Sequence, residues 1–485
     1  MKRLIIGGDY IDTGYYHDVI SPGSGEAFER ISIASDRDTV RRAIDIAYDA
    51  FQSFSREALA KRIKILRKAA DLMEASSEEL ARTLAMESGK PIRDARVEIM
   101  RTVALFRIAS EEAKLVLEGK VHRVDAYEYP PGNENRLVME IREPIGVVGA
   151  ILPFNFPANS FAHKVAPNIA AGNTVVVKPA SATPLSALEL ASILYRAGLP
   201  KGVLSVLPGP ASIVGEEIVS NRKVSGITFT GSTASGLAIA SKAVSHGKRV
   251  MMEMGGSDPI IVLEDADISR AAQIAARARY EYAGQNCNAG KRIIVHEKIV
   301  ERFVDAFLEN VRKIRVGDPL SEETDMGPVI SEESLRNLES MVREALEKGG
   351  KLLHGGERIR HKGFYLTPTV IYEPQLDARV MREEVFGPVA PIVRFSKDEE
   401  AIKIANSTDY GLQAAVFTRD IARALRIARE LRTGGVMIND STRLRWDALP
   451  FGGVKLSGLG GREGVRSTIV NMTEVKIISI NIAPS

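Results

Sequence analysis

Short apolar runs alternate with stretches of helical periodicity from residue 145 onward. The runs indicate buried strands, and turn residues such as Pro153 and Gly198 end the elements. Strands that alternate with helices at this density indicate right-handed βαβ units and a parallel sheet covered on both faces. Sheets of this kind bind ligands at the carboxyl ends of their strands. The predicted strands span residues 145–152, 173–177, 203–207, 226–230, 250–254 and 260–263, and the predicted helices span 186–195, 212–220 and the residues after 233.

A second alternating stretch runs from about Asp267 to Asp440 and predicts another α/β domain. Paired glycines at 349–350 and 434–435 mark the end of a helix and a break before the last strand. The predicted helices span 267–283, 297–312 and 332–348, and strands are expected near Arg292, Val370, Ala414 and Val436.

Three segments lie outside these stretches. Apolar residues recur at helical spacing between Arg56 and Glu79, which predicts an amphipathic helix. Val121–Arg142 and Ser467–Ile482 have strand-like patterns without a core of their own, which favours an arm that pairs with another subunit. The helix carries a basic run that we interpret as a solvated face, formed by Lys61, Arg62, Lys64, Arg67 and Lys68.

Composition narrows the class of protein. The 485 residues correspond to about three compact units at roughly 150 residues per domain. A hydrophobic content of 45% and a charged content of 26% are typical of a globular protein, and a net charge of +3 gives no reason to expect nucleic acid or a membrane surface as a partner. The seven histidines lack metal-binding spacing, so no metal is expected. Only Leu4–Ile6 follow Lys2 and Arg3 as apolar residues, too few for an export signal, which favours the cytoplasm.

The single cysteine, Cys287, is a candidate nucleophile. A lone cysteine forms no internal disulfide, so it is either a buried small residue or a reactive thiol. Its neighbours are Asn286 and Asn288, with Gly284 and Gly290 three positions away on each side. A structural cysteine usually sits in an apolar stripe, so this polar frame favours the reactive thiol.

Two further residues have environments that suit catalysis. Glu253 stands among methionines at the end of a predicted strand, and an apolar setting raises a carboxyl pKa toward that of a general base. A structural ion pair is the alternative. Asn155 lies in a rigid turn between two prolines and two phenylalanines, where its amide could donate to an oxyanion. An Asx turn is the alternative here.

The sequence lacks the G-x-G-x-x-G fingerprint after its first strands and has no P-loop. Gly231 and Gly236 follow a strand and precede a helix, whose N-terminus could hold a phosphate. Glycines at such turns also have a purely steric use.

Taken together, five ordered segments resemble the aldehyde dehydrogenase superfamily over nearly the whole chain. Gly284–Cys287 is similar to the nucleophile motif and Met252–Gly256 to the general-base motif of that family. Pro153–Pro157 is similar to its oxyanion loop, although Trp is commoner than Phe at position 154. Phe229–Ser232 is similar to its pyrophosphate turn, and Glu383–Pro388 to its ribose and nicotinamide motif.

The resemblance implies an α/β fold with a Rossmann-like cofactor domain, a second α/β catalytic domain and a β-strand oligomerisation arm. On this basis we expect residues 1–118 and 146–253 to bind the cofactor and residues 254–454 to carry the nucleophile. Residues 119–145 and 455–485 would form the arm and C-terminal tail of a homodimer or homotetramer.

The resemblance also implies a mechanism without a metal. The Cys287 thiolate attacks the aldehyde, and the Asn155 side chain with the Cys287 amide binds the oxyanion. Glu253 then activates the water that hydrolyses the thioester. The residues implied at the nicotinamide cofactor are Phe154, Lys178, Ser181, Gly231, Ser232, Gly255, Glu384 and Phe386.

Ser181 bears on the choice of cofactor, because NAD-preferring relatives often carry Glu at the matching position. A carboxylate there would repel a 2′-phosphate, whereas Ser leaves room and a hydroxyl donor, and Lys178 is near in sequence. We therefore expect NADP to be accepted and preferred over NAD.

The substrate is less well defined. Relatives that oxidise succinate semialdehyde carry Arg where this chain has His163 and Glu281, so that substrate is disfavoured. Arg443 and Arg445 could steer a phosphate or carboxylate, as in non-phosphorylating glyceraldehyde-3-phosphate dehydrogenases, or face solvent. Lactaldehyde, glyceraldehyde or a broad aldehyde range remain open, and a cofactor-independent thioesterase or esterase is the alternative from another class. The substrate candidates are Phe156, His163, Arg443, Arg445 and Phe451.

Overall fold

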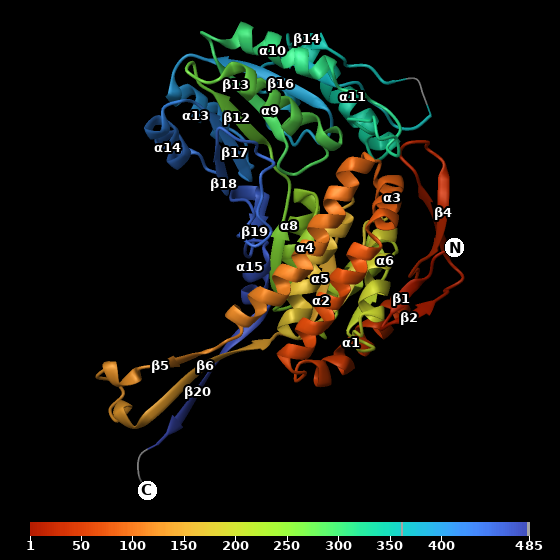
Figure 1. Cartoon of the computed structure of the whole chain (residues 1–485), viewed down its shortest axis with the longest axis vertical. Coiled ribbons are helices and arrows are strands. Elements are labelled where there is room, and N and C mark those ends of the chain that lie inside the picture. The colour runs from red at the N-terminus through yellow and green to blue at the C-terminus, as the bar shows by residue number, and fades with distance from the viewer. Residues whose placement is uncertain (360–361, 483–485) are drawn as a thin grey trace.

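The computed structural model describes residues 1–359 and 362–482. Figure 1 shows two layered α/β units, one above the other in this view, and an arm that projects from the lower unit. Each unit is built on its own sheet, and the arm is a third sheet.

The lower unit contains an eight-stranded sheet in the order β19-β11-β10-β7-β8-β9-β1-β2. Its five central strands run parallel, while β19, β1 and β2 are added antiparallel at the edges. The unbroken apolar runs predicted from the sequence are the parallel strands, which are buried on both faces. The bounds are β1 Leu4–Ile6, β2 Asp9–Ile11, β7 Val147–Ile151, β8 Thr174–Lys178, β9 Leu204–Val206, β10 Val224–Thr230, β11 Arg249–Glu253 and β19 Gly458–Leu459.

Helices cover both faces of this sheet. Val175 and Val177 of β8 face a core formed with α2–α6 and α15, while Val176 faces the opposite core with α1, α7 and α8. This alternation is the period of two expected for a strand. The bounds are α1 Arg37–Phe54, α2 Leu59–Ala75, α3 Ser77–Ser88, α4 Ile92–Val116, α5 Pro157–Ala171, α6 Leu185–Arg196, α7 Glu216–Ser220, α8 Thr233–Ser245 and α15 Val465–Asn471.

The upper unit contains a seven-stranded sheet in the order β14-β15-β16-β13-β12-β17-β18, parallel except for β14. One continuous apolar core joins the sheet to its helices. The strands are β12 Asp258–Val262, β13 Gly290–His296, β14 Lys351–His354, β15 Thr369–Tyr372, β16 Val389–Phe395, β17 Gln413–Phe417 and β18 Gly435–Ile438. The helices are α9 Ile268–Tyr280, α10 Val300–Arg312, α11 Glu332–Glu347, α12 Arg379–Arg382, α13 Asp398–Asn406 and α14 Ile421–Glu430.

The arm is a three-stranded antiparallel sheet in the order β20-β6-β5, with β5 Lys120–His122, β6 Arg136–Pro144 and β20 Thr473–Asn481. It extends away from both units at the lower left of Figure 1. A separate hairpin joins β3 Tyr16–Ile20 to β4 Ala27–Ser32. The short helical turns are η1 Val124–Ala126, η2 Asn133–Asn135, η3 Ala211–Gly215, η4 Glu281–Gly284 and η5 Lys455–Ser457.

The structure corrects three local predictions. The helix expected from Arg56 to Glu79 is two helices, because the chain leaves helical geometry at Ser76 between α2 and α3. Its basic run is not wholly solvated, since Arg62 is buried and occupies the space beside Gly172 at the end of α5. The tail from Ser467 does not begin as a strand; its first residues belong to α15, which packs on α4 and α5, and only β20 joins the arm. The segment 455–485 is therefore divided between the first unit and the arm.

Three strands of the first sheet end at Lys178, Thr230 and Glu253, so their side chains meet along one edge of the sheet. The loop before β13 brings Cys287 of the second unit to this edge. Within residues 1–359 and 362–482, no helix is long and apolar enough to cross a membrane.

Candidate active site

A small cavity of about 60 Å³ lies between the carboxyl edge of the first sheet and the loop before β13. It brings together Asn155, Glu253 and Cys287, which the sequence singled out as catalytic candidates. Four of the five substrate candidates also line it: Phe156, Arg443, Arg445 and Phe451. The wall is completed by residues that the sequence analysis did not identify, namely Arg101, Asn159, Ser160, Thr230, Asn288 and Glu463.

Cys287 is a half-buried free thiol at the end of a strained turn. Tyr282 and Ala283 both adopt left-handed backbone geometry, with φ of 52° and 51°. Residues other than glycine rarely take this conformation. Lys291 fixes the far side of the loop, because its Nζ donates to the Cys287 carbonyl at 2.8 Å. Burial raises the pKa of the Cys287 thiol to about 12, and the Glu253 carboxylate adds to this, while the charge of Lys291 opposes it.

Glu253 has the environment of a base. It is 3% exposed, and its Oε1 has no hydrogen-bond partner within the described part of the chain. Burial raises its pKa well above that of an ordinary carboxyl group, and the neighbouring Glu463 adds to the effect. A carboxylate whose pKa is raised accepts a proton more readily than an ordinary one, as a general base must.

Asn155 faces the nucleophile loop. Its Nδ2 donates to the Gln285 carbonyl at 3.0 Å, two residues before Cys287. An amide nitrogen carries two hydrogens, so one remains for a ligand in the cavity that the side chain lines. In an Asx turn the side chain would bond to its own neighbouring backbone, whereas this hydrogen bond joins Asn155 of the first unit to Gln285 of the second.

A buried network of charges surrounds Glu253. Glu463 accepts from Lys164 Nζ at 2.8 Å and from Arg445 Nη2 at 3.0 Å. Burial alone would raise the pKa of Glu463, but Lys164 and the other nearby cations hold it well below its usual range. Arg445 also contacts His163 Nε2 at 2.7 Å, and His163 lies 3.1 Å from Asp447. The site thus carries a fixed anion beside a carboxyl group that resists ionisation.

The two loop arginines do not face solvent. Each side chain is 13% exposed, with Arg443 paired to Glu281 and Arg445 paired to Glu463. The solvent-facing interpretation is therefore wrong. His163 is buried behind Arg445 and is not part of the cavity wall.

Lys178 is the last residue of β8, and Ser181, which was predicted at the adenosine end of a cofactor, follows it. Lys178 is 6% exposed, and its Nζ donates to the Pro179 carbonyl at 3.1 Å. Burial lowers the pKa of Lys178 to about 8. Ser181 is exposed, and the ring of His17 lies 3.1 Å from its carbonyl oxygen.

The turn after β10 leads into α8, whose N-cap is Ser232. Its side chain accepts from the Ser235 amide, while the amides of Thr233 and Ala234 have no acceptor among the described residues. Free amides at the start of a helix, next to the Gly231 turn, suit a pyrophosphate. The donors at this edge therefore fit a dinucleotide.

The residues predicted at the nicotinamide end come from the second unit. Glu384 accepts from Lys291 Nζ at 2.7 Å and from the Gly256 amide at 3.0 Å. A Cβ at Gly255 would lie 2.3 Å from the Glu384 carboxylate, so a side chain here would displace that carboxylate. The Phe386 ring meets Phe154 edge-on at 5.7 Å, which joins the two predicted motifs.

Lys164 and Glu463 could not be paired from the sequence, because the two residues are 299 positions apart along the chain. One feature of the sequence could have identified Lys164, namely that this lysine stands within an apolar segment. The segment forms α5, and every residue of α5 is buried. Lys291 lies four residues after Cys287, but the direction of its side chain depends on the fold.

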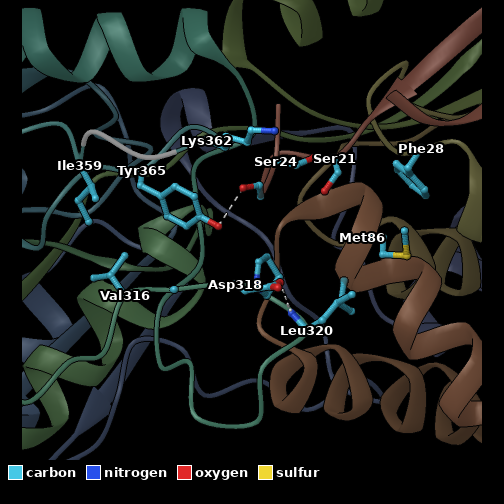
Figure 2. Close-up of a pocket in the computed structure, with 14 residues that line it drawn as sticks. Ser21, Ser24, Phe28, Met86, Val316, Asp318, Leu320, Ile359, Lys362 and Tyr365 are labelled. Carbon is cyan, nitrogen blue, oxygen red and sulfur yellow. Dashed lines mark hydrogen bonds between the residues drawn. The ribbon is translucent and has the colours of Figure 1, made fainter. Parts of the chain in front are cut away.

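A larger cavity of about 560 Å³ lies elsewhere, between the β3–β4 hairpin and the loops around Asp318 and Tyr365. Figure 2 shows Phe28, Met86 and Leu320 in its wall, together with the hydrogen bond from Tyr365 to the Gly23 carbonyl. None of the predicted site residues lines it.

Comparison with known proteins identifies the family. The model of the aldehyde dehydrogenase family matches residues 11–478. The chain belongs to the aldehyde dehydrogenase family. It is an oxidoreductase that acts on aldehydes with NAD or NADP, as the resemblance predicted.

Relatives within this aldehyde dehydrogenase family are similar over nearly their full length. Lactaldehyde dehydrogenase of Methanocaldococcus jannaschii is 43% identical, covering 96% of this chain and 97% of the relative. The 3-sulfolactaldehyde dehydrogenase of Priestia aryabhattai is 40% identical, covering 99% and 98%. Among solved structures, glyceraldehyde-3-phosphate dehydrogenase GapN of M. jannaschii, complexed with NADP, has a TM-score of 0.90 at 42% identity, covering 96% and 98%. The NAD-dependent aldehyde dehydrogenase of Sinorhizobium meliloti has a TM-score of 0.95 at 36% identity, covering 100% and 95%.

Proposed function

We propose that this aldehyde dehydrogenase oxidises a small hydroxyaldehyde of the lactaldehyde or glyceraldehyde type, with NADP preferred. The observation that carries the proposal is the pairing of each guanidinium group in the cavity wall with a carboxylate.

The charges at the cavity support an uncharged substrate. Arg443 and Arg445 are each paired with a carboxylate, and Arg101 is paired with Asp447 at 2.7 Å. A phosphate dianion would have to compete with these buried carboxylates for the guanidinium groups. Asn159 and Ser160 offer neutral partners for a substrate hydroxyl instead.

The proposed reaction uses the three side chains that meet in the cavity. The Cys287 thiol loses its proton to water, and the thiolate forms a bond to the aldehyde carbon. The resulting oxyanion accepts hydrogen bonds from Asn155 Nδ2 and from the Cys287 amide. The bound nicotinamide supplies the acceptor for the hydride that leaves this carbon. Glu253 then removes a proton from water, which hydrolyses the thioester and releases the carboxylic acid.

The NADP preference rests on the residues that follow β8. Ser181 leaves space and a hydroxyl group where a carboxylate would exclude a 2′-phosphate, and Lys178 lies three residues before it at the end of β8. We place the adenosine end of the cofactor here, its pyrophosphate at the α8 N-terminus, and its nicotinamide end beside Glu384 and Phe386.

We propose that the arm joins two subunits and that the chain works as a homodimer or homotetramer. β20 is an edge strand, and its Val475, Ile477 and Ile480 side chains are 47%, 56% and 42% exposed. An exposed apolar edge of this length is a template for pairing with another chain.

Phosphorylated glyceraldehyde is the second candidate substrate. Arg443 keeps Nε and Nη1 buried without a hydrogen-bond partner among the described residues, so two of its donors could bind an anion. This observation makes Arg443 the place at which the two candidates differ.

An aldehyde panel with NADP tests the proposal. We expect the highest kcat/KM for lactaldehyde or glyceraldehyde, and lower values for succinate semialdehyde and glyceraldehyde 3-phosphate. For the neutral aldehydes, kcat/KM of Arg443→Ala should differ little from that of the native enzyme. A kcat/KM for glyceraldehyde 3-phosphate that exceeds all others tenfold and is lost in Arg443→Ala would establish the second candidate.

A further inference from the structure

Lys90 is a buried lysine that the reaction described above does not use. It lies between α3 and α4, immediately before Pro91, and its side chain is 1% exposed. Its Nζ forms an ion pair with Glu98 of α4 and donates to the backbone carbonyl of Asn155 at 3.0 Å. A buried ammonium group thus contacts the residue that we place at the oxyanion.

The same ammonium is enclosed by two aromatic rings. Its Nζ lies 3.6 Å from the centroid of Phe156 and 4.5 Å from that of Tyr282, and the two rings meet edge-on at 6.3 Å. Phe156 follows Asn155 in the first unit, whereas Tyr282 belongs to the left-handed turn that precedes Cys287 in the second. A cation between two ring faces holds both loops, because each ring is attracted to the same charge.

Glu98 extends this arrangement to the start of α5. Its Oε2 pairs with Lys90, and its Oε1 accepts from the amides of Ala158 and Asn159, each at 3.1 Å. A carboxylate at the first turn of a helix satisfies amides that have no partner within the helix. The backbone at Asn155 and at the start of α5 is therefore anchored to one buried ion pair.

We propose that Lys90 is a positioning residue that holds the Asn155 amide in register with Cys287. The inference rests on the proposed oxyanion role of Asn155. Without Lys90, the Asn155 carbonyl loses its donor, and the contact between the Phe156 and Tyr282 loops loses its central charge. A displacement of about 1 Å in such a group is enough to reduce a rate by roughly 100-fold.

A double-mutant cycle separates positioning from general structural support. The variants are Lys90→Met, Asn155→Ala and the two combined, and the readout is the single-turnover rate of NADPH formation. We expect a loss of roughly 100-fold or more for Asn155→Ala and about 10- to 100-fold for Lys90→Met. In the Asn155→Ala background, Lys90→Met should reduce the rate by less than threefold, because the two act through one hydrogen-bonding group.

Lys248 provides a matched control. It is also buried, and its Nζ donates to the carbonyls of Asn221 and Val224, away from the cavity. Lys248→Met should lower thermal stability but leave the single-turnover rate within twofold, and both lysine variants should bind NADP as tightly as the native enzyme. Lys90→Arg, which keeps the charge and its donors, should recover at least tenfold of the rate lost in Lys90→Met.

Each outcome supports or overturns the positioning role of Lys90. Losses that multiply in the double variant, or a Lys90→Met rate within threefold of native, overturn the positioning role. Native activity in Asn155→Ala refutes the oxyanion assignment itself, which distinguishes that failure from the failure of Lys90. If Lys90→Met does not fold, the same cycle is run with Lys90→Gln, and multiplicative losses there overturn the proposal equally.

Discussion

Replacing Ser181 with glutamate should convert the cofactor preference from NADP to NAD. Two unit charges 4 Å apart repel each other by about 1 kcal/mol in water and about 4 kcal/mol near a protein surface. Ser181 is exposed, so we take a value of about 2 kcal/mol, which corresponds to roughly 30-fold in kcat/KM for NADP. A carboxylate that accepts a ribose hydroxyl adds about 1.4 kcal/mol for NAD, or roughly tenfold. The ratio of the two kcat/KM values should therefore change by about 300-fold.

The assay measures kcat/KM for both cofactors at saturating aldehyde in the native enzyme, Ser181→Glu and Ser181→Gln. The glutamine variant has the shape of glutamate without its charge, so it should lose less than fivefold with NADP. An NADP:NAD ratio in Ser181→Glu within threefold of native would refute the reasoning. An equal loss in the two variants would show that size, and not charge, sets the preference.

Three further predictions concern buried charges. Burial lowers the pKa of Lys178 to about 8, so its side chain is a cation below that pH and neutral above it. KM for NADP, but not for NAD, should therefore rise between pH 7 and 10 with a midpoint near 8. A ratio of KM for NADP to KM for NAD that does not change with pH would contradict the role of Lys178. Glu463→Gln leaves Lys164 and Arg445 without their shared anion, which should cost about 3–5 kcal/mol and lower the thermal midpoint by roughly 3–5 °C, a shift that a melting curve measures directly. The same change removes a charge that raises the pKa of Glu253, so the acid limb of the rate profile should move to lower pH, and a move to higher pH would contradict the electrostatic account.

The parallel strands were predictable because each is a short apolar run buried on both faces. The runs placed the strand ends within one residue of Lys178 and Glu253. Adjacent runs at 250–254 and 260–263 gave no sign that they belong to different sheets, since β11 and β12 are separated by only a few residues. The arrangement of strands into sheets depends on long-range pairing, which periodicity does not contain.

The catalytic candidates were found because each stands in an unusual local frame, as Cys287 does among polar residues and glycines. The network around Glu253 was not found, because ion pairing between Lys164 and Glu463 joins segments that are distant in the chain. Burial of Arg443 and Arg445 also depended on partners elsewhere, and their loop position alone suggested exposure. Local patterns therefore identified the candidate reacting groups, whereas their electrostatic environment could be described only from the fold.

Covalent catalysis by Cys287 is tested most directly by mass spectrometry of the Glu253→Gln enzyme after it is mixed with aldehyde and NADP. Because the base that activates water is absent, the account predicts one burst of NADPH per active site and an acyl group on the peptide that contains Cys287. Steady turnover without a burst or an adduct, or NADPH formation by Cys287→Ser, would contradict it.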